Sequence, residues 1–448
     1  MLSFLTSPLL RMQECKEKMS DFNVETLIFD NGERYPVLIG EDGMPHFHVT
    51  LWVTSKLRSK GLAQSTITNK IRHINRLLTW ARNQKIDLFS QFKEGNFLKL
   101  HDIEQLKTFI SINLLQKNLF KATQRNKIIL FDKAIVNQQF IPTNGSSHQS
   151  DMITSIADYL VFIAQLATQF NPTLESNQNI KEMEKLLKSC KPKNKNKKNV
   201  NRSLSVPEQL AREFMSIAHF ENVKNPFVNE GVRFRNHLMF SLLESLGLRR
   251  GEMLSMKLTN LVLHGSEKTI MVTRSHDDEY DSRQRQPVAK TKERQLAISD
   301  SLAEGISLYI KKYRSKIPNS GKHPYLFVTH KASDTQGKPI SGSSFDNTIV
   351  PTMRSVDERF LVIYPHYFRH DWNERFSNVV DKINRESESE KEKISPDKEA
   401  KMRKHQMGHS LEESGNTYNQ RHVVRRANEL VLIEQQELEA SRKDYDGE

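Results

Sequence analysis

The sequence predicts a mainly α-helical protein with a small antiparallel β-sheet, an α+β fold class in which a helical N-terminal domain precedes a larger mixed domain. Two patterns support this prediction. Apolar residues recur every three to four positions along most of the chain, which is helical spacing, whereas only a few short runs favour strands. In addition, a length of 448 residues is enough for two or three domains, and 37% hydrophobic residues can form their cores.

Changes in charge and in apolar spacing divide the chain into five parts. Residues 1–50 carry 8 acidic and only 4 basic side chains. Short strand-like pieces such as Thr26–Phe29 occur there, broken by turns at Asn31-Gly32 and Asp42-Gly43. The expected parts are an N-terminal extension over 1–45, a helical domain over 46–190, a basic linker over 191–204, a larger domain over 205–422 and a tail helix over 423–448.

Three helices are expected in the first domain. Ser65 can cap the first, the second fits Asp102 to about Leu115, with Leu106, Phe109 and Ile110 inward, and the third fits Ile153–Ala167. The apolar face of the first consists of Ile67, Ile71, Ile74, Leu77, Leu78 and Ala81. The apolar face of the third consists of Ile153, Ile156, Ala157, Leu160, Ile163 and Ala164.

The linker contains five lysines in the eight residues 191–198 and no apolar side chain, so it cannot pack into a core. Two interpretations are open. The segment is either a tether without contacts or a basic strap that lies along phosphates.

The second domain mixes helices with short strands. A helix is expected to start at Ser205-Val206-Pro207-Glu208, because proline suits a first helical turn. Strands are expected at Thr269–Thr273, Gln295–Ile298 and Tyr325–Thr329. Two polar stretches, His276–Arg285 and Arg385–Lys404, are expected to be surface insertions. The tail carries a narrow apolar stripe of Ala427, Val431 and Leu438.

The chain is basic, with 67 Lys and Arg against 54 Asp and Glu, a net charge of +13. Residues 51–200 hold 24 basic and 10 acidic side chains, so the excess lies in the helical domain and linker. Such charge favours a polyanionic partner, nucleic acid first. No run of 18 apolar residues occurs, so no membrane partner is expected. Cys15 and Cys190 lie far apart, which favours a reducing cytoplasm over disulfides or a cysteine zinc site.

The first of three notable stretches is LGLRRGEML over residues 246–254. Gly247 is expected to end a helix that contains Leu238–Leu243, and Glu252–Lys257 is expected to begin another. Arg249 then lies in a tight junction between helices. A guanidinium there needs an anion, which is either Glu252 or a ligand.

The other two stretches carry histidines. In His366-Tyr367-Phe368-Arg369-His370, helical spacing puts His366 and Arg369 on one face, where a proton carrier and a bidentate cation suit a phosphate. In the third, Gly408 can end a helix before His409, and Tyr418 follows nine residues later. A tyrosine can be a covalent nucleophile or simply a packed side chain. No phosphate loop, His-Glu-x-x-His or EF-hand motif occurs.

Taken together in this order and spacing, the three stretches resemble the tyrosine recombinase (phage integrase) family. The resemblance covers about residues 46–422 and is strongest over 205–422. It implies a core DNA-binding domain over 46–190 and a catalytic domain over 205–422. The helical domain, basic linker and long insertions resemble recombinases carried by transposons or other mobile elements.

In this family two arginines, a lysine, two histidines and a tyrosine act on one DNA phosphate. Arg249 matches the first arginine, with its neighbour Arg250 as the alternative. Lys290 matches the lysine, with Lys292 as the alternative, because a strand-like run follows this segment. The spacing from Arg249 to Lys290 is longer than is common in the family, which leaves the lysine open. The other matched residues are His366, Arg369, His409 and Tyr418.

The resemblance implies that Tyr418 attacks the scissile phosphorus, forms a 3′-phosphotyrosyl bond and releases a 5′-hydroxyl. Arg249, Arg369 and His409 would stabilise the transition state, His366 would be the base and Lys290 the acid. No cofactor, metal or ATP is expected, because the covalent ester keeps the bond energy.

The implied partner is double-stranded DNA, held by a homotetramer on two DNA sites with possible element-encoded helper proteins, and the implied location is the bacterial cytoplasm at the nucleoid. The tail helix would dock on its own domain or on a neighbour. Candidate DNA contacts near the Ser65 helix are Arg58, Lys60, Lys70, Arg72 and Arg76. The alternatives are a type IB topoisomerase or telomere resolvase, and a non-catalytic DNA-binding accessory protein.

Overall fold

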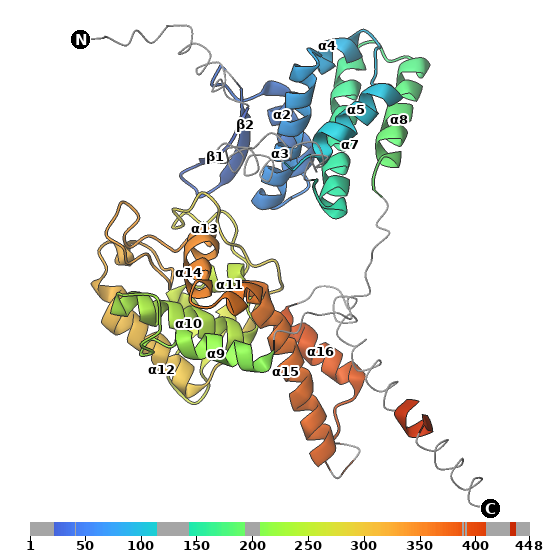
Figure 1. Cartoon of the computed structure of the whole chain (residues 1–448). Helices are drawn as coiled ribbons and strands as arrows, with labels where there is room; N and C mark the ends of the chain where they lie inside the picture. The colour runs from blue at the N-terminus through green and yellow to red at the C-terminus, as the bar shows by residue number, and fades with distance from the viewer. Residues whose placement is uncertain are drawn as a thin grey trace, which may run out of the picture. The chain divides into compact units, whose positions relative to one another are not determined.

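The structure is a computed structural model that describes residues 22–40, 42–113, 143–192, 207–387, 389, 392–408 and 431–435. It confirms the predicted fold class, since helices dominate and both sheets are small and antiparallel (Figure 1). The described residues form two compact units. Unit 1 takes those of 1–29 and 34–202, and unit 2 takes those of 30–33 and 203–448.

Unit 1 begins with a β-hairpin of β1 (Asn23–Ile28) and β2 (Arg34–Ile39). The strands are antiparallel, with Asn23 opposite Ile39. The hairpin packs on the helices that follow, because Leu38 is completely buried in the same apolar cluster as their inward side chains. The acidic start of the chain therefore contributes to the core of this unit.

The helices of unit 1 are α2 (Phe47–Trp52, continued by a π-helical stretch over Val53–Arg58), α3 (Gln64–Asn83), α4 (Leu88–Lys93), α5 (Leu100–Ser111), α7 (Ser146–Thr168) and α8 (Leu174–Ser189). The predicted apolar faces of α3 and α7 are buried, apart from the half-buried Leu78. The predicted ends were less accurate. Ala63 precedes α3 in place of Ser65, and α5 ends at Ser111 because Ile112 adopts extended backbone.

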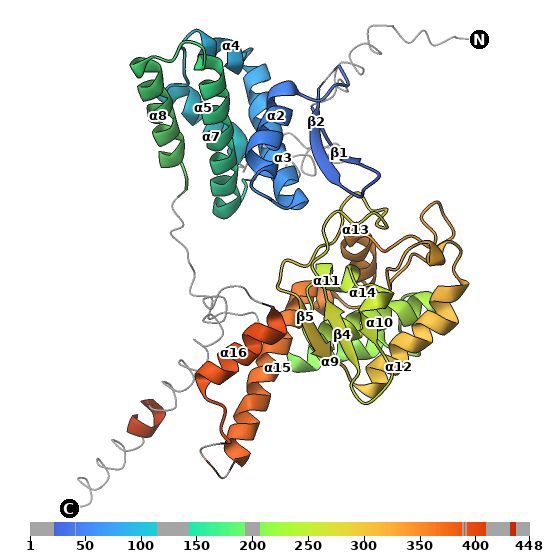
Figure 2. The same ribbon diagram turned by 180° about the vertical axis from the view of Figure 1, so that it is seen from behind.

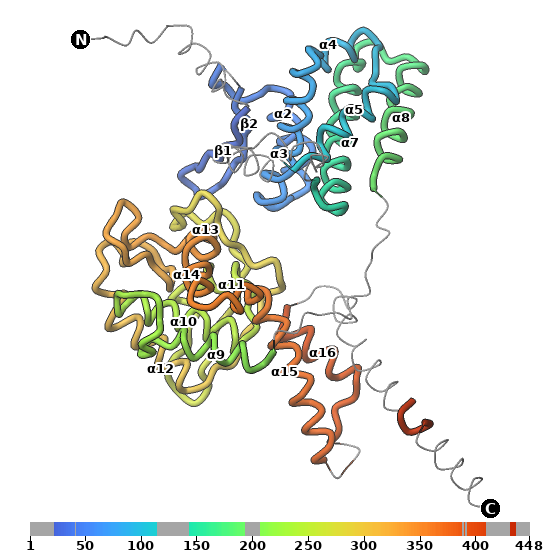
Figure 3. The backbone as a smooth tube through the Cα atoms, in the orientation of Figure 1, coloured from blue at the N-terminus to red at the C-terminus, as the bar shows by residue number. Residues whose placement is uncertain are grey.

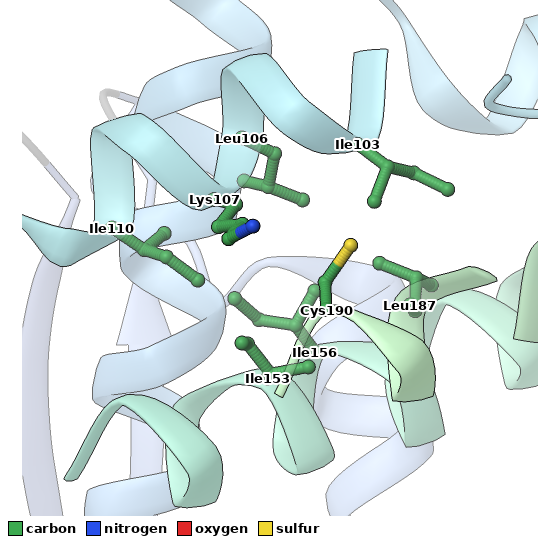
Figure 4. Close-up of a pocket in the computed structure, with 8 residues that line it drawn as sticks. All are labelled: Ile103, Leu106, Lys107, Ile110, Ile153, Ile156, Leu187 and Cys190. Carbon is green, nitrogen blue, oxygen red and sulfur yellow. The ribbon is translucent and has the colours of Figure 1, made fainter. Parts of the chain in front are cut away.

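The core of unit 1 is closely packed. Where α5, α7 and α8 meet, the remaining gap has a volume of about 10 Å³ and is lined mainly by apolar side chains such as Ile103, Ile156 and Leu187 (Figure 4). A gap of this size holds at most one water, and its lining offers few polar partners. It is a packing gap and does not qualify as a ligand site.

Unit 2 surrounds a second apolar cluster. Its helices are α9 (Glu208–Ala218), α10 (Glu230–Leu246), α11 (Arg250–Leu254), α12 (Asp300–Leu308), α13 (Gly342–Ser344), α14 (Val350–Arg354), α15 (Pro365–Glu386) and α16 (Pro396–Met407). The chain reverses after α15, and α16 returns beside it (Figure 3), where the guanidinium of Arg403 donates to the Ser377 hydroxyl at 2.6 Å.

The sheet of unit 2 has the order β3-β4-β5, from β3 (Leu261–Val262), β4 (Thr269–Val272) and β5 (Arg294–Ala297). Figure 2 shows β4 and β5 side by side, with Thr269 opposite Ala297. These two strands confirm two of the predictions. The strand predicted at Tyr325–Thr329 was wrong, because this segment makes only isolated bridges, from Tyr325 to Lys257 and from Val328 to Pro339.

The two polar stretches expected on the surface are partly buried. In the first, Arg283 is 6% exposed and forms a bidentate ion pair with Asp281, while its Nη1 donates to the carbonyls of Leu254 and Ile340. In the second, Glu399 and Arg403 of α16 are buried as an ion pair. Most of the described residues in both stretches are exposed, as expected, and the buried exceptions are charged side chains that find partners in the interior.

Of the predicted tail helix, the structure describes only 431–435, a short helical piece on which Val431, Leu432 and Ile433 are exposed. Ala427 and Leu438 lie outside the described residues, as do most of the linker lysines. Within the described ranges, none of the helices combines the length and apolarity that a membrane span needs.

Candidate active site

The site begins at the junction between α10 and α11, as the sequence predicted. Gly247 ends α10 in the left-handed conformation, with φ +57°. A Cβ atom there would lie 2.8 Å from Cγ of Trp372, so no other residue fits without rearrangement. This turn makes Arg249 the residue that precedes α11.

Arg249 is tied to Glu252 but remains partly open. Its backbone N–H donates to Oε2 of Glu252 at 3.1 Å, and its Nη1 lies 3.4 Å from Oε1. Its side chain is 32% exposed, so the guanidinium can still meet a ligand. The alternative arginine, Arg250, instead forms an ion pair with Asp346.

Glu252 is the buried centre of a polar network and is only 2% exposed. Its carboxylate accepts from the Thr291 hydroxyl at 2.7 Å and from Nη2 of Arg294 at 2.9 Å. Burial alone would raise the pKa of Glu252, but the Arg294 charge and these hydrogen bonds lower it below its usual value. The carboxylate is therefore ionised at neutral pH.

Arg294 and Thr291 are members of the site that sequence reasoning did not identify. One signal could have revealed Arg294, because it occupies an inward position of β5, whose residues alternate between buried and exposed. An inward charge in a strand needs a counter-charge. The segment Lys290–Lys292 precedes this strand, in the long connection from β4.

The segment Lys290–Lys292 presents both candidate lysines. Thr291 is buried, whereas Lys290 and Lys292 on either side of it are exposed. The backbone N–H of Lys292 donates to the carbonyl of Gly408 at 3.0 Å. The arrangement therefore fixes the segment beside the end of α16 and leaves both lysines as candidates for the acid.

The long helix α15 brings His366 and Arg369 to the same region. Pro365 starts the helix, and the two residues are one turn apart on it. Arg369 is 2% exposed, and its Nη1 and Nη2 donate to the carbonyls of Gly247 and Met407, each at 2.8 Å. It therefore joins the end of α10 to the end of α16.

His366 is exposed and lies against His370, with ring centroids 4.5 Å apart in an edge-to-face arrangement. Although much of its surface is accessible, the protein atoms around the ring remove part of its hydration, which lowers the pKa of His366, and the nearby charges of His370, Arg369 and Arg249 lower it further. The pKa of His370 is lowered by burial and by Arg369. Both imidazoles are thus favoured in the neutral form, which can accept a proton.

The last element of the site is the end of α16. Gly408 is left-handed at φ +62°, and a Cβ atom there would lie 2.8 Å from both Nη1 of Arg294 and Cβ of Thr291. The expected helix end at Gly408 is confirmed. His409 follows directly, and both His409 and Tyr418 lie outside the described residues.

The structure thus links Arg249, Arg369 and the segment Lys290–Lys292 to the end of α16, with His366 near the two arginines. Several cations and neutral imidazoles in one place suit a phosphate group. Among the residues that the structure describes, no group of three or more His, Cys, Asp or Glu is arranged to hold a metal ion.

Unit 1 carries a separate polar groove of about 770 Å³ between α3 and α7. Three of the five predicted DNA contacts, Lys70, Arg72 and Arg76, line it, whereas Arg58 and Lys60 are not among its lining residues. Other lining residues include Asn69, His73, Asn144, His148, Thr154 and Ser155. This composition offers donors to a polyanion as well as groups that could read base edges.

The predicted DNA contacts differ in their present partners. Arg76 donates to the carbonyl of Phe109 at 2.7 Å, and Nζ of Lys70 lies 3.5 Å from Oδ2 of Asp158. The Arg58 guanidinium lies over the Tyr35 ring, 4.7 Å from its centroid. Arg72 bonds Asn69 within α3, and Lys60 is exposed.

Comparison with known proteins gives one family. The model of the phage integrase family matches residues 217–382, a range that contains Arg249, Lys290, His366 and Arg369 but ends before His409. No curated protein sequence matches the chain.

Solved recombinases are similar to the chain at low identity. The XerA recombinase has 14% identity, with 83% of this chain and 92% of that chain covered, and a TM-score of 0.32. A Tn1549 transposon integrase in complex with transposon right end DNA has 13% identity, with 83% of this chain and 94% of that chain covered, and a TM-score of 0.45. The XerH recombinase bound to its difH substrate has 13% identity, with 83% of this chain and 91% of that chain covered, and a TM-score of 0.37.

Proposed function

Because this chain belongs to the phage integrase family of site-specific tyrosine recombinases through residues 217–382, we propose that it cuts and rejoins DNA through a 3′-phosphotyrosyl intermediate. One observation carries the proposal. Arg369 and the lysine segment bond directly to the end of α16, and Arg249 is linked to it through Glu252 and Arg294. His366 lies near enough to Arg249 and Arg369 for their charges to lower its pKa. Such convergence is what attack on a single phosphate requires.

In the proposed reaction Tyr418 attacks the scissile phosphorus and displaces the 5′-oxygen of the next nucleotide. Charge builds up on the non-bridging oxygens in the transition state. Arg249 and Arg369, together with His409, stabilise that charge by donating hydrogen bonds to it. Since a phenol has a pKa near ~10, the same cations also favour the phenolate that attacks.

Proton transfer is assigned to two groups. His366 accepts the tyrosine proton, and its lowered pKa keeps it available as a base at neutral pH. Lys290 protonates the leaving 5′-oxygen, with Lys292 as the alternative. When a different 5′-hydroxyl attacks the ester, the strands are exchanged, and we propose that neither ATP nor a metal ion is needed.

The two units divide the task. Unit 1 grips double-stranded DNA through the α3–α7 groove and the linker lysines, and unit 2 performs the chemistry. We assign the chain to a mobile element that it integrates or excises, as a homotetramer on two DNA sites, with element-encoded helpers, in the bacterial cytoplasm. The tail containing Val431 docks on its own unit or on a neighbour.

The test uses nicked duplex fragments from the DNA that flanks the gene, which trap a covalent intermediate when the short 3′ piece diffuses away. The full-length protein should form a denaturant-resistant adduct that disappears in Tyr418→Phe. An adduct that survives this substitution would exclude Tyr418 as the nucleophile. Fragments that bind without any adduct would favour a non-catalytic DNA-binding protein, and relaxation of any supercoiled plasmid without site preference would favour a topoisomerase.

A further inference from the structure

Arg294 makes three separate interactions, each to a different part of the site. Its Nη2 donates to Glu252 at 2.9 Å, its Nη1 to the Thr291 hydroxyl at 3.0 Å, and its Nε to the carbonyl of Gln406 at 2.6 Å. The side chain of Arg294 is 1% exposed, so water does not compete for these bonds.

Each partner lies next to a residue with a proposed role in the reaction. Glu252 binds the backbone N–H and the guanidinium of Arg249. Thr291 lies between the two candidate lysines. Gln406 lies three positions before His409, in the last turn of α16. One guanidinium therefore joins the partner of Arg249, the lysine segment and the last turn of α16.

The surrounding atoms leave little room for a different arrangement. Gly408 approaches so closely that a Cβ atom would meet Nη1 of Arg294 at 2.8 Å. The backbone N–H of Lys292 is bonded to the carbonyl of the same glycine. The lysine segment and the end of α16 thus share both a backbone bond and a common arginine.

We propose that Arg294 is a positioning residue that sets the distance between the lysine segment, Arg249 and the last turn of α16. The inference rests on the proposed function and deepens it, since Arg294 acts through its neighbours and does not touch DNA. A planar guanidinium can hold three partners in fixed directions, which a lysine ammonium cannot do. Its replacement should misplace the acid more than it weakens DNA binding.

The test compares Arg294→Lys with Arg314→Lys in the full-length protein. Arg314 is a matched control, because it is also buried and donates to the carbonyls of Tyr325, Ser320 and His323. Single-turnover cleavage is measured on nicked DNA with an ordinary scissile phosphate and with a 5′-bridging sulfur, whose departure needs no acid. Hydrogen exchange of peptides over 288–293 is measured without DNA.

Arg294→Lys should slow cleavage of ordinary DNA by about 10- to 100-fold more than cleavage of the sulfur substrate. It should also speed exchange at the Lys292 amide, whereas Arg314→Lys should change neither the substrate ratio nor this exchange. Thr291→Val, which keeps the shape but removes the hydroxyl, should act in the same direction, and Thr291→Ser should restore the wild-type ratio.

An equal loss on both substrates, with unchanged exchange over 288–293, would overturn the positioning role. If the wild-type chain cleaves neither substrate, the proposed function fails, and the exchange measurement alone decides the inference. Faster exchange in Arg294→Lys would then support the structural part of the proposal, and unchanged exchange would refute it.

Discussion

Glu252→Gln should be among the most damaging isosteric changes in unit 2. The carboxylate oxygens accept from three residues: Oε1 from Thr291 and, weakly, from Nη1 of Arg249, and Oε2 from Arg294 and the backbone N–H of Arg249. An amide replaces one of these oxygens by an NH₂ group. Whichever way the amide turns, a donor then faces a donor.

The loss is large because Arg294 stays buried without its counter-charge. Removing one partner of a buried ion pair costs about 3 to 5 kcal/mol. We therefore expect the free energy of unfolding of unit 2 to fall by about that amount, as measured by urea denaturation followed by circular dichroism. Arg294→Met combined with Glu252→Gln should recover about 2 kcal/mol of the loss, since the unpaired charge is then gone.

The same pair predicts a pH dependence of stability. The pKa of Glu252 is lower in the folded state than in the unfolded state. The contribution of this carboxylate to the free energy of unfolding is therefore complete above the unfolded pKa of about 4.3 and is lost as pH falls through the folded pKa. The difference between wild type and Glu252→Gln should therefore shrink below pH ~4. A destabilisation under about 1 kcal/mol at pH 7, or one that does not shrink in acid, would refute this reasoning.

Four further results are expected. Gly247→Ala should destabilise unit 2 by about 2 kcal/mol or more, because the added Cβ meets Trp372. Gly61→Ala, at a similar φ of +65° but with no neighbour within 4 Å, should destabilise unit 1 by only about 1 kcal/mol. Equal losses of stability in urea denaturation would exclude the contact with Trp372 as a cause. Because His366 must be neutral to act as a base, the acid limb of the pH–rate profile should lie below pH ~6.5. His370→Asn should move this limb to higher pH, because it removes a nearby positive charge that lowers the pKa of His366. An unmoved limb would argue against the electrostatic effect of His370 on His366. Replacing Lys70 and Arg72 by Ala should reduce the slope of log affinity against log salt concentration by about 0.9 for each DNA phosphate that the protein no longer neutralises. Lys185→Ala, on the exposed face of α8, should leave this slope unchanged. Identical slopes in all variants would show that the groove does not bind DNA. Adduct formation should continue in EDTA, and its loss there would reveal a metal requirement.

The apolar pattern was the most reliable part of the sequence. The stripe on α3 predicted which side chains are buried, because the helical period repeats over 20 residues. Helix ends were less predictable, since Ala63 precedes α3 without a side-chain cap and Ser65 lies inside the helix. Glycine was the clearest end signal, at Gly247 and Gly408, where a left-handed residue is needed.

Charged residues were harder to place, because a sequence does not say which charges pair. The stretch around Arg283 is polar in sequence, but Asp281 and two backbone carbonyls satisfy it in the interior. For the same reason the motifs identified Arg249 and Arg369 without predicting their partners. Neither Arg294 nor the bond from Arg369 to Met407 can be derived from spacing, since each joins segments brought together only by folding.

The two buried arginines of the site differ in what holds them. Arg294 is matched by the Glu252 carboxylate, so that pair adds little net charge. Arg369 is held by the carbonyls of Gly247 and Met407, which are dipoles at two helix ends and carry no full charge. The charge of Arg369 also acts on Glu252 and lowers its pKa, so this one carboxylate faces three guanidinium groups, those of Arg249, Arg294 and Arg369. A simple dianion such as sulfate should consequently compete with DNA for this site and raise the melting temperature of the unbound protein by mass action.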